Sequence, residues 1–294
     1  MTIVAVFFSF GVFFISFSLI QKKKLSLFIA VTSIILGKNF GDTDYPSLIF
    51  SEHTYGMLSL ATFTLILGFI ANKNVFIASV VTMILISIHP VIGVWTFILV
   101  AISFYYSKTY IIYSKDIYKG VLIGFFLITT SFLFYYFNTI EKVTYDNNLF
   151  LDYLNNWDGH RIISKTIHYE YLAKTLLLSF FCILGLKKKF DTLSYSPHLL
   201  IILLSSVFSS IFYLLYKFYP YIFPDFFKVI MPSRFIMLHT FIGWPVIICT
   251  VIFLTKNLFK NKIIILISTL LVLILVQNYD RIFLKKDNIK NNLE

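Results

Sequence analysis

Long apolar stretches alternate with short polar ones along almost the whole chain. A helix that spans a membrane needs about 20 mostly apolar residues, with a range of roughly 17–25. The apolar stretches of this chain lie at 3–20, 25–37, 55–71, 75–106, 120–137, 171–186, 199–216, 236–254 and 263–279. Most of them have the length of one span, so the pattern predicts an all-α protein, a polytopic transmembrane helical bundle.

The stretch 75–106 is too long for a single crossing. It holds 32 residues without a charge, which as one helix would extend about 48 Å, whereas the hydrocarbon core is only about 30 Å thick. His89-Pro90 lies in its middle, and proline interrupts the helical hydrogen-bond ladder. We therefore predict two passes, 75–88 and 91–106, joined by a short hairpin at His89-Pro90.

The distribution of positive charge supports this hairpin. With two passes there, five loops share one side of the membrane: 21–24, 72–74, 107–119, 187–198 and 255–262. These 40 residues hold 13 of the 25 lysines and arginines and only two acidic residues. Loops rich in Lys and Arg face the cytoplasm. The sequence thus predicts about ten spans in the inner or plasma membrane, with both termini outside.

Composition changes the picture only by excluding other classes. The chain is 58% hydrophobic and 13% charged, whereas a soluble domain carries roughly 25% charged residues. The net charge of +11 comes from clusters that flank apolar stretches, so it indicates membrane lipids and no nucleic acid as partner. We expect residues 1–294 to form a single integral membrane domain.

The first outer loop carries two candidate groups of polar residues. Asp42 and Asp44 could bind a divalent cation such as Mg²⁺ or Mn²⁺, or divide into an acid and a base. Glu52 and His53 lie directly before an apolar stretch, where an unpaired charge is costly. A pair of solvated or interfacial side chains is the alternative for both groups.

The hairpin and the long outer loop 138–170 provide further candidates. His89 begins the pattern His-Pro-x-x-Gly-x-Trp, which fits either a structural hairpin tip or a site role for the histidine. In the loop, apolar residues recur with helical spacing from Phe150 to Trp157, which predicts an amphipathic interfacial helix. His160 and Arg161 follow it, and the planar Arg fork suits phosphate or carboxylate.

The outer loop 217–235 is rich in proline and aromatic residues, which excludes one regular helix and suits an interfacial segment. Pro232-Ser233-Arg234 then opens the next stretch, with His239 one turn or so further along. Arg234 in a first helical turn opposes the helix dipole. It is therefore a candidate for function, and snorkelling to lipid phosphates is the structural alternative.

This organisation resembles the integral-membrane glycosyltransferases of the GT-C class, which use polyprenyl-phosphate sugar donors. The resemblance implies that Asp42 and Asp44 are the acidic pair of the first outer loop and hold a metal, and that Arg161 or Arg234 contacts lipid phosphate. We take Asp42, Asp44, Glu52 and His89 as candidate catalytic residues. The candidates for substrate binding are His53, His160, Arg161, Arg234 and His239.

The sequence therefore favours a membrane glycosyltransferase or polysaccharide-assembly enzyme that acts on lipid-linked sugars at the outer face. A transporter or flippase is one alternative, although it would carry ionisable residues in mid-membrane, and here Lys174 and His239 lie near the ends of their stretches. A non-catalytic assembly subunit is the other alternative, and it would make no outer polar residue individually important.

Overall fold

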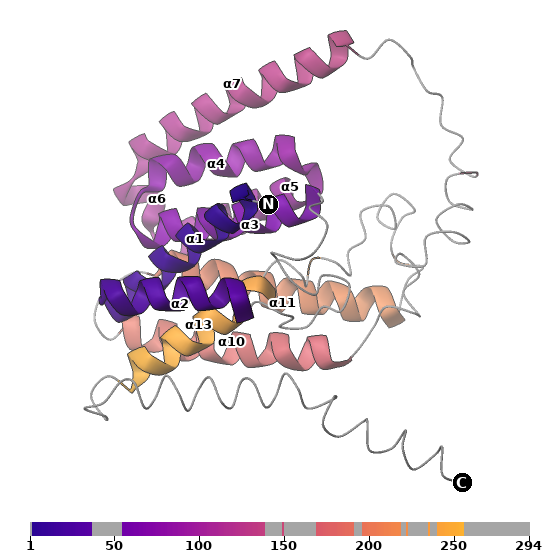
Figure 1. The fold of residues 1–294 in the computed structure, drawn as a ribbon. Helices are drawn as coiled ribbons and strands as arrows, with labels where there is room; N and C mark the ends of the chain where they lie inside the picture. The colour runs from indigo at the N-terminus through magenta and orange to yellow at the C-terminus, as the bar shows by residue number, and fades with distance from the viewer. Residues whose placement is uncertain are drawn as a thin grey trace.

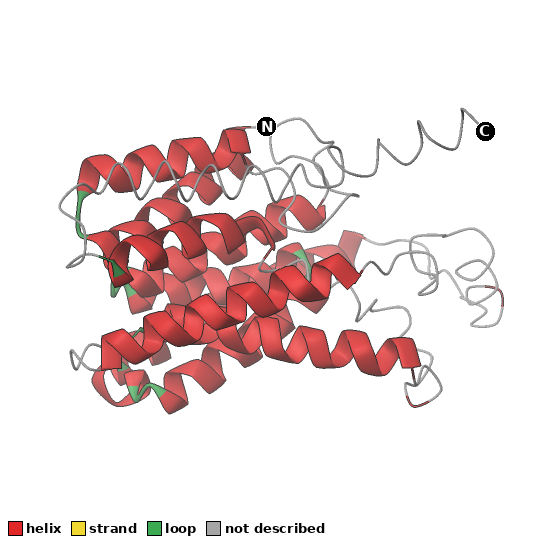
Figure 2. Cartoon of the chain, turned by 90° about the horizontal axis from the view of Figure 1, so that it is seen from below, coloured by secondary structure: helices red, strands yellow, loops and turns green. Residues whose placement is uncertain are grey.

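The structure, a computed structural model, describes residues 2–36, 55–138, 149, 169–190, 196–218, 222, 235 and 240–255. Within these ranges the chain is helical, is joined by short turns and contains no strand (Figure 2). The helices of Figure 1 are α1 (Thr2–Ile20), α2 (Lys23–Leu36), α3 (Tyr55–Ala71), α4 (Val75–Ile88), α5 (Pro90–Tyr106), α6 (Thr109–Ile112), α7 (Ser114–Asn138), α10 (Tyr169–Phe190), α11 (Pro197–Phe218) and α13 (Thr240–Leu254). The all-α prediction is confirmed for this part of the chain.

Several helices have the length and composition of membrane spans. Three of them qualify by both criteria, over Ile3–Ile20, Ser114–Asn138 and Pro197–Tyr216. Four shorter apolar helices lie at Tyr55–Ala71, Val75–Ile88, Pro90–Tyr106 and Ile242–Leu254. These helices indicate a membrane protein. The apolar stretch 263–279 and the predicted interfacial helix at 150–157 lie outside the described residues.

Two helices extend further than their apolar stretches. α7 begins at Ser114, six residues before the stretch 120–137, and the short α6 precedes it in a region expected to be a loop. α10 likewise continues through Lys187–Lys189. Lysine is a good helix former, so a helix need not end where its apolar residues end.

The predicted break at His89-Pro90 is confirmed. α4 ends at Ile88, His89 is extended with φ −150° and ψ 95°, and α5 begins at Pro90. The two helices approach so closely after the turn that a Cβ added at Gly93 would overlap the backbone of Ile86. The chain therefore reverses there and forms a helical hairpin (Figure 1).

The register between α4 and α7 shows the same reversal independently. Gly120 of α7 lies against Ser79 of α4, and one turn later Gly124 lies against Met83. Both sequences advance in the same direction along this contact, so α4 and α7 are parallel. Since α5 connects α4 to α7 in the chain, it must run in the opposite direction to both.

The N-terminal helix crosses α3 at a pair of glycines. The backbone of Gly11 lies directly against Thr64 and Leu65, and Gly68 lies against Gly11 itself. Small residues allow this approach of two backbones, which is a common way for membrane helices to associate through van der Waals contact. The crossing joins α1 to α3 without any intervening side chain.

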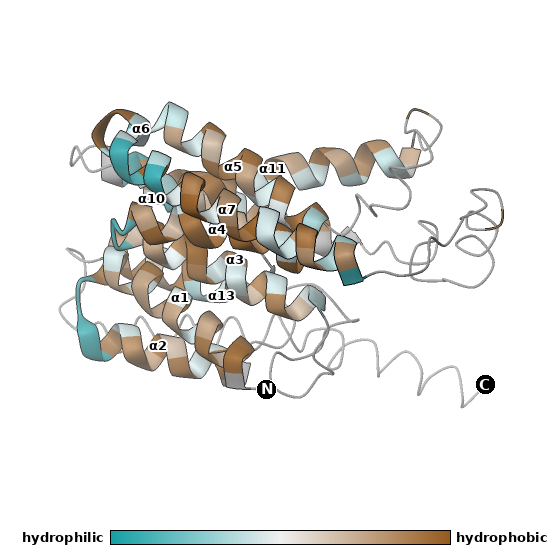
Figure 3. Cartoon of the chain, turned by 90° about the horizontal axis from the view of Figure 1, so that it is seen from above, coloured by the Kyte–Doolittle hydropathy of each residue, from teal (hydrophilic) through white to brown (hydrophobic). Residues whose placement is uncertain are grey.

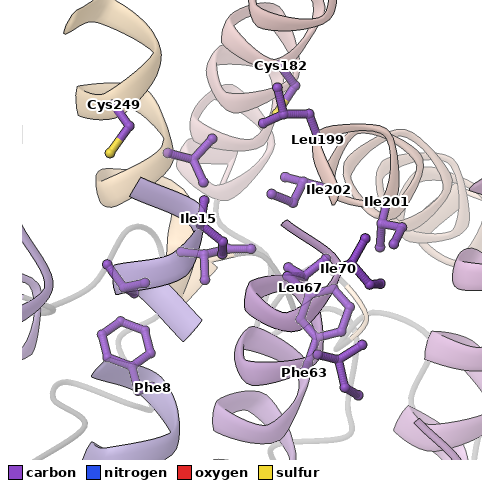
Figure 4. Close-up of a cluster of buried hydrophobic side chains, with 14 of the residues drawn as sticks. Phe8, Ile15, Phe63, Leu67, Ile70, Cys182, Leu199, Ile201, Ile202 and Cys249 are labelled. Carbon is purple, nitrogen blue, oxygen red and sulfur yellow. The ribbon is translucent and has the colours of Figure 1, made fainter. Parts of the chain in front are cut away.

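The hydrophobic core lies where α1, α3, α10, α11 and α13 meet (Figure 4). Helices from both halves of the described chain contribute to it. Its fully or nearly fully buried members include Phe8, Ile15, Phe63, Leu67, Ile70, Cys182, Leu199, Ile201, Ile202 and Cys249. One continuous core thus joins the N-terminal and C-terminal helices.

Most lysines of the described helices lie at one end of the bundle, which we call the lysine end. Ser103, near the end of α5, donates to the carbonyl oxygen of Pro197 at the start of α11 (2.8 Å). Lys188, near the end of α10, donates to the carbonyls of Phe253 and Leu254 at the end of α13 (3.1 and 2.8 Å). Figure 3 shows the hydrophilic colour gathered at this end, where α2 begins and α6 lies.

Candidate functional site

The described ranges contain one of the nine site residues predicted from the sequence, His89. It lies at the end of the bundle opposite the lysines, at the tip of the α4–α5 hairpin (Figure 1). The other eight fall outside the described residues: Asp42, Asp44, Glu52, His53, His160, Arg161, Arg234 and His239. Their roles stay predictions.

His89 closes one helix and opens the next. Its backbone N–H donates to the Leu85 carbonyl oxygen (2.9 Å), while its Nδ1 accepts from the Ile92 backbone N–H (3.4 Å). Pro90 occupies the first position of α5, where the missing N–H costs nothing. An accepting Nδ1 places the proton of the neutral imidazole on Nε2. The half-buried ring is thereby fixed at the hairpin tip.

An aromatic cluster packs Phe235 against α5 and α11. Trp95 stacks on Phe235, with ring centroids 4.6 Å apart and planes at 15°, and meets Phe212 and Phe208 of α11 edge-on at 5.5 and 6.3 Å. Phe235 is buried and directly follows Arg234 in the sequence. We call these four aromatic residues the Trp95 cluster. It joins Phe235 to α5, the helix whose N-cap is His89.

Two hydrogen-bond donors beside this cluster have no protein partner. Trp95 Nε1 and Thr96 Oγ1 are both buried, and neither makes a hydrogen bond in the described part of the chain. A buried polar group left in this state costs about 1–3 kcal/mol, so such groups call for an explanation. An indole N–H and a hydroxyl are suitable donors for a phosphate or sugar oxygen.

Trp95 is part of the hairpin pattern in the sequence, but neither Trp95 nor Thr96 was predicted as a site residue. The available signal was its place six residues after His89, about 9 Å along the helix axis. The contact with Phe235 had no signal at all, because nothing in the local sequence of either segment indicates the other.

A second polar junction lies at the lysine end. His198 is buried in the first turn of α11, and its Nε2 lies 3.3 Å from Ser18 Oγ of α1. In α1, two residues before Ser18, Ser16 Oγ lies 3.2 Å from the Cys249 thiol of α13. The sequence placed His198 in a loop, whereas it lies in α11 and joins that helix to α1. It is remote from the hairpin tip, at the opposite end of the bundle.

The metal prediction rests entirely on residues that the structure does not describe. Among the residues that it does describe, no three or more His, Cys, Asp or Glu side chains gather into a group that could hold a metal ion. Asp42 and Asp44 belong to the remainder of the chain. The divalent cation therefore stays a prediction.

Comparison with protein-family models, with curated proteins and with solved structures gives no match to this chain.

Proposed function

We propose that the protein is a multi-pass protein of the inner or plasma membrane, with its lysine end in the cytoplasm and both termini outside. The support is that nine lysines lie at helix ends that share this side: Lys22, Lys23, Lys24, Lys73, Lys108, Lys115, Lys119, Lys187 and Lys188. Loops and helix ends rich in lysine are retained on the cytoplasmic side. The hairpin tip at His89 then faces outward.

We propose further that this outer end binds a polyprenyl-phosphate-linked sugar and that the protein is a glycosyltransferase or polysaccharide-assembly enzyme. One observation carries the proposal: the stack of Phe235 on Trp95. It places Phe235, the residue that follows Arg234 in the sequence, on the helix whose N-cap is His89. Trp95 Nε1 belongs to this cluster and Thr96 follows it in α5, and neither donor has a hydrogen-bond partner among the described residues.

In this proposal the arginines hold the phosphate and the acidic residues do the chemistry. Arg161 and Arg234 would bind phosphate oxygens bidentately. Asp42 and Asp44 would need a cation between themselves and the phosphate, because bare carboxylates would repel it. Glu52 and His89 would serve as acid and base, with hydrogen bonds to substrate from His53, His160 and His239.

The distribution of charge within the helices favours chemistry at the surface over ion-coupled transport. In the described helices every Lys, Asp and Glu lies within about two turns of a helix end, Lys174 of α10 being a typical case. A proton- or sodium-coupled transporter would carry such groups in mid-membrane.

The test is binding of a radiolabelled long-chain polyprenyl phosphate to the purified protein in neutral detergent. Trp95→Phe keeps an aromatic ring but removes the indole donor, and a hydrogen bond to a charged group is worth about 1.5–3 kcal/mol. We expect affinity to fall roughly tenfold or more. The matched control, Trp244→Phe, removes a buried indole of α13 and should leave affinity unchanged.

Two results would overturn the proposed site: unchanged binding in both Trp95→Phe and Arg234→Lys, or equal affinity for the neutral polyprenol of the same chain length. Phosphate-dependent binding without transfer of sugar from any polyprenyl-phosphate donor would instead favour a flippase or an assembly subunit.

A further inference from the structure

The chain makes a sharp, well-bonded elbow between α5 and α7 at the lysine end. The Ser107 backbone N–H donates to the Ser103 carbonyl oxygen (2.9 Å), and its hydroxyl lies 2.6 Å from that of Thr109. After the single turn of α6, the Tyr113 N–H donates to the Thr109 carbonyl oxygen (3.0 Å). We call residues 105–119 the tyrosine–lysine elbow.

The outer surface of this elbow is aromatic and basic. Tyr105, Tyr106, Tyr110 and Tyr118 are exposed, and Tyr105 and Tyr110 stack with centroids 5.8 Å apart and planes at 13°. Exposed lysines stand among them at positions 108, 115 and 119, against one acidic residue, Asp116. Tyrosine hydroxyls and lysine ammonium groups are both donors that fit phosphate oxygens.

The lysines hold these positions against local preference. Lys108 has φ 56° and ψ 18°, the left-handed conformation that glycine adopts without steric penalty and other residues do not. Lys115 and Lys119 lie four residues apart on one face of α7 and repel each other. Lys115 also stands in the first turn of α7, where positive charge opposes the helix dipole.

We propose that the tyrosine–lysine elbow binds the phosphate headgroups of anionic phospholipids in the leaflet at this end of the protein. The general preference for positive charge on the cytoplasmic side accounts for lysines anywhere at this end. It does not account for four exposed tyrosines around three of them. Phospholipid is favoured over free phosphate because Ile111 and Ile112 are also exposed here, as in segments that insert into the interface.

The test titrates purified protein in neutral detergent with fluorescent phosphatidylglycerol and, separately, with phosphatidylcholine. We compare two triple variants that each remove three charges from the same end. The first is Lys108→Gln, Lys115→Gln, Lys119→Gln in the elbow. The second is Lys22→Gln, Lys23→Gln, Lys24→Gln in the α1–α2 turn, which has no tyrosine near it in the sequence.

We expect the wild-type protein to prefer phosphatidylglycerol. The elbow variant should lose roughly 100-fold in affinity, since each lysine near an anionic headgroup is worth about 1 kcal/mol. The turn variant should lose clearly less, because its lysines act only through general charge attraction and have no tyrosine beside them in the sequence. Equal losses in both variants would overturn the proposal and leave only general charge attraction. Unchanged affinity in the elbow variant would also overturn it.

A single substitution separates binding from folding. Lys108→Gly suits the left-handed backbone better than lysine does, so the thermal midpoint should stay level or rise. Phosphatidylglycerol affinity should nonetheless fall about fivefold, the equivalent of one lysine near the surface. A Lys108→Gly protein that binds this lipid as tightly as wild type would contradict a role for the side chain.

Discussion

Replacing Gly11 by alanine should separate α1 from α3. The added Cβ would overlap the Thr64 carbonyl oxygen and lie 2.8 Å from Leu65 N, whereas ordinary contacts begin near 3.4 Å. Both obstacles are backbone atoms, which cannot rotate away as a side chain can. α1 would therefore have to move outward by about 0.6 Å or more at the crossing, and contacts of Phe8 and Ile15 in the core would loosen.

The expected cost follows from this geometry. Overpacking of a closely packed contact costs typically about 1–3 kcal/mol, while Gly→Ala within a helix returns up to about 1 kcal/mol of helix propensity. A control that gains the same propensity without the clash isolates the steric part. Gly185→Ala is that control, because its Cβ would meet only the side-chain methyls of Leu199 at 3.2 Å and Thr250 at 3.4 Å.

The assay is reversible unfolding of each purified variant in mixed micelles by titration with sodium dodecyl sulfate, followed by far-UV circular dichroism. The free energy of unfolding of Gly11→Ala should lie about 1–3 kcal/mol below that of Gly185→Ala. Equal stability of the two variants would show that the α1–α3 crossing is not as close as the structure has it.

Three further outcomes test other parts of the structure. Lys188→Met should lower the free energy of unfolding by about 1 kcal/mol, because the Lys188 ammonium donates hydrogen bonds to carbonyls at the end of α13. Lys187→Met, at an exposed neighbour, should not lower it, and equal effects of the two substitutions would contradict this role of Lys188. A cysteine at Asn138 should react with an impermeant maleimide in intact cells and one at Lys187 only after permeabilisation, and equal labelling from outside would refute the topology. Asp42→Asn with Asp44→Asn should abolish transfer from polyprenyl-phosphate sugars and its divalent-cation dependence at unchanged membrane levels, and normal transfer would exclude the metal-dependent mechanism.

The positions of the helices could be predicted from the sequence because lipid imposes a simple requirement. Backbone polar groups must be satisfied within the helix and side chains must be apolar over the span. The stretches 3–20 and 55–71 therefore coincide almost residue for residue with α1 and α3. Outside the lipid this requirement no longer applies. The first turns of α7, before residue 120, have a polar sequence, and the apolar pattern therefore did not predict that they are helical.

The packing of the helices could not be predicted in the same way. In water an apolar stripe marks the face that is buried, but lipid accepts apolar side chains on every face. Nothing in the sequence around Gly11 therefore shows that it meets Thr64, or that Gly120 meets Ser79.

The candidate site was predictable only where a covalent constraint marked it. Pro90 fixed the hairpin tip and with it the place of His89. The stack of Trp95 on Phe235 joins residues far apart in the chain. Because the chain has many aromatic residues, nothing in the sequence indicates that these two contact each other. For His198 the prediction was wrong. Its neighbours Ser196 and Pro197 have a sequence typical of a loop, yet all three residues are buried.

The shortness of the helices beside the hairpin has a mechanical consequence for the surrounding bilayer. α4 contains 14 residues and α5 contains 17, about 21 and 25 Å of helix, against a hydrocarbon thickness of about 30 Å. Hydrophobic mismatch of this size is relieved by local thinning of the bilayer. Lipids beside the exposed apolar face of α5 would then have their headgroups nearer the bilayer centre than lipids further away, and so closer to His89. Acyl-chain length would therefore act on this protein as a ligand does, with short chains stabilising it and long chains straining it.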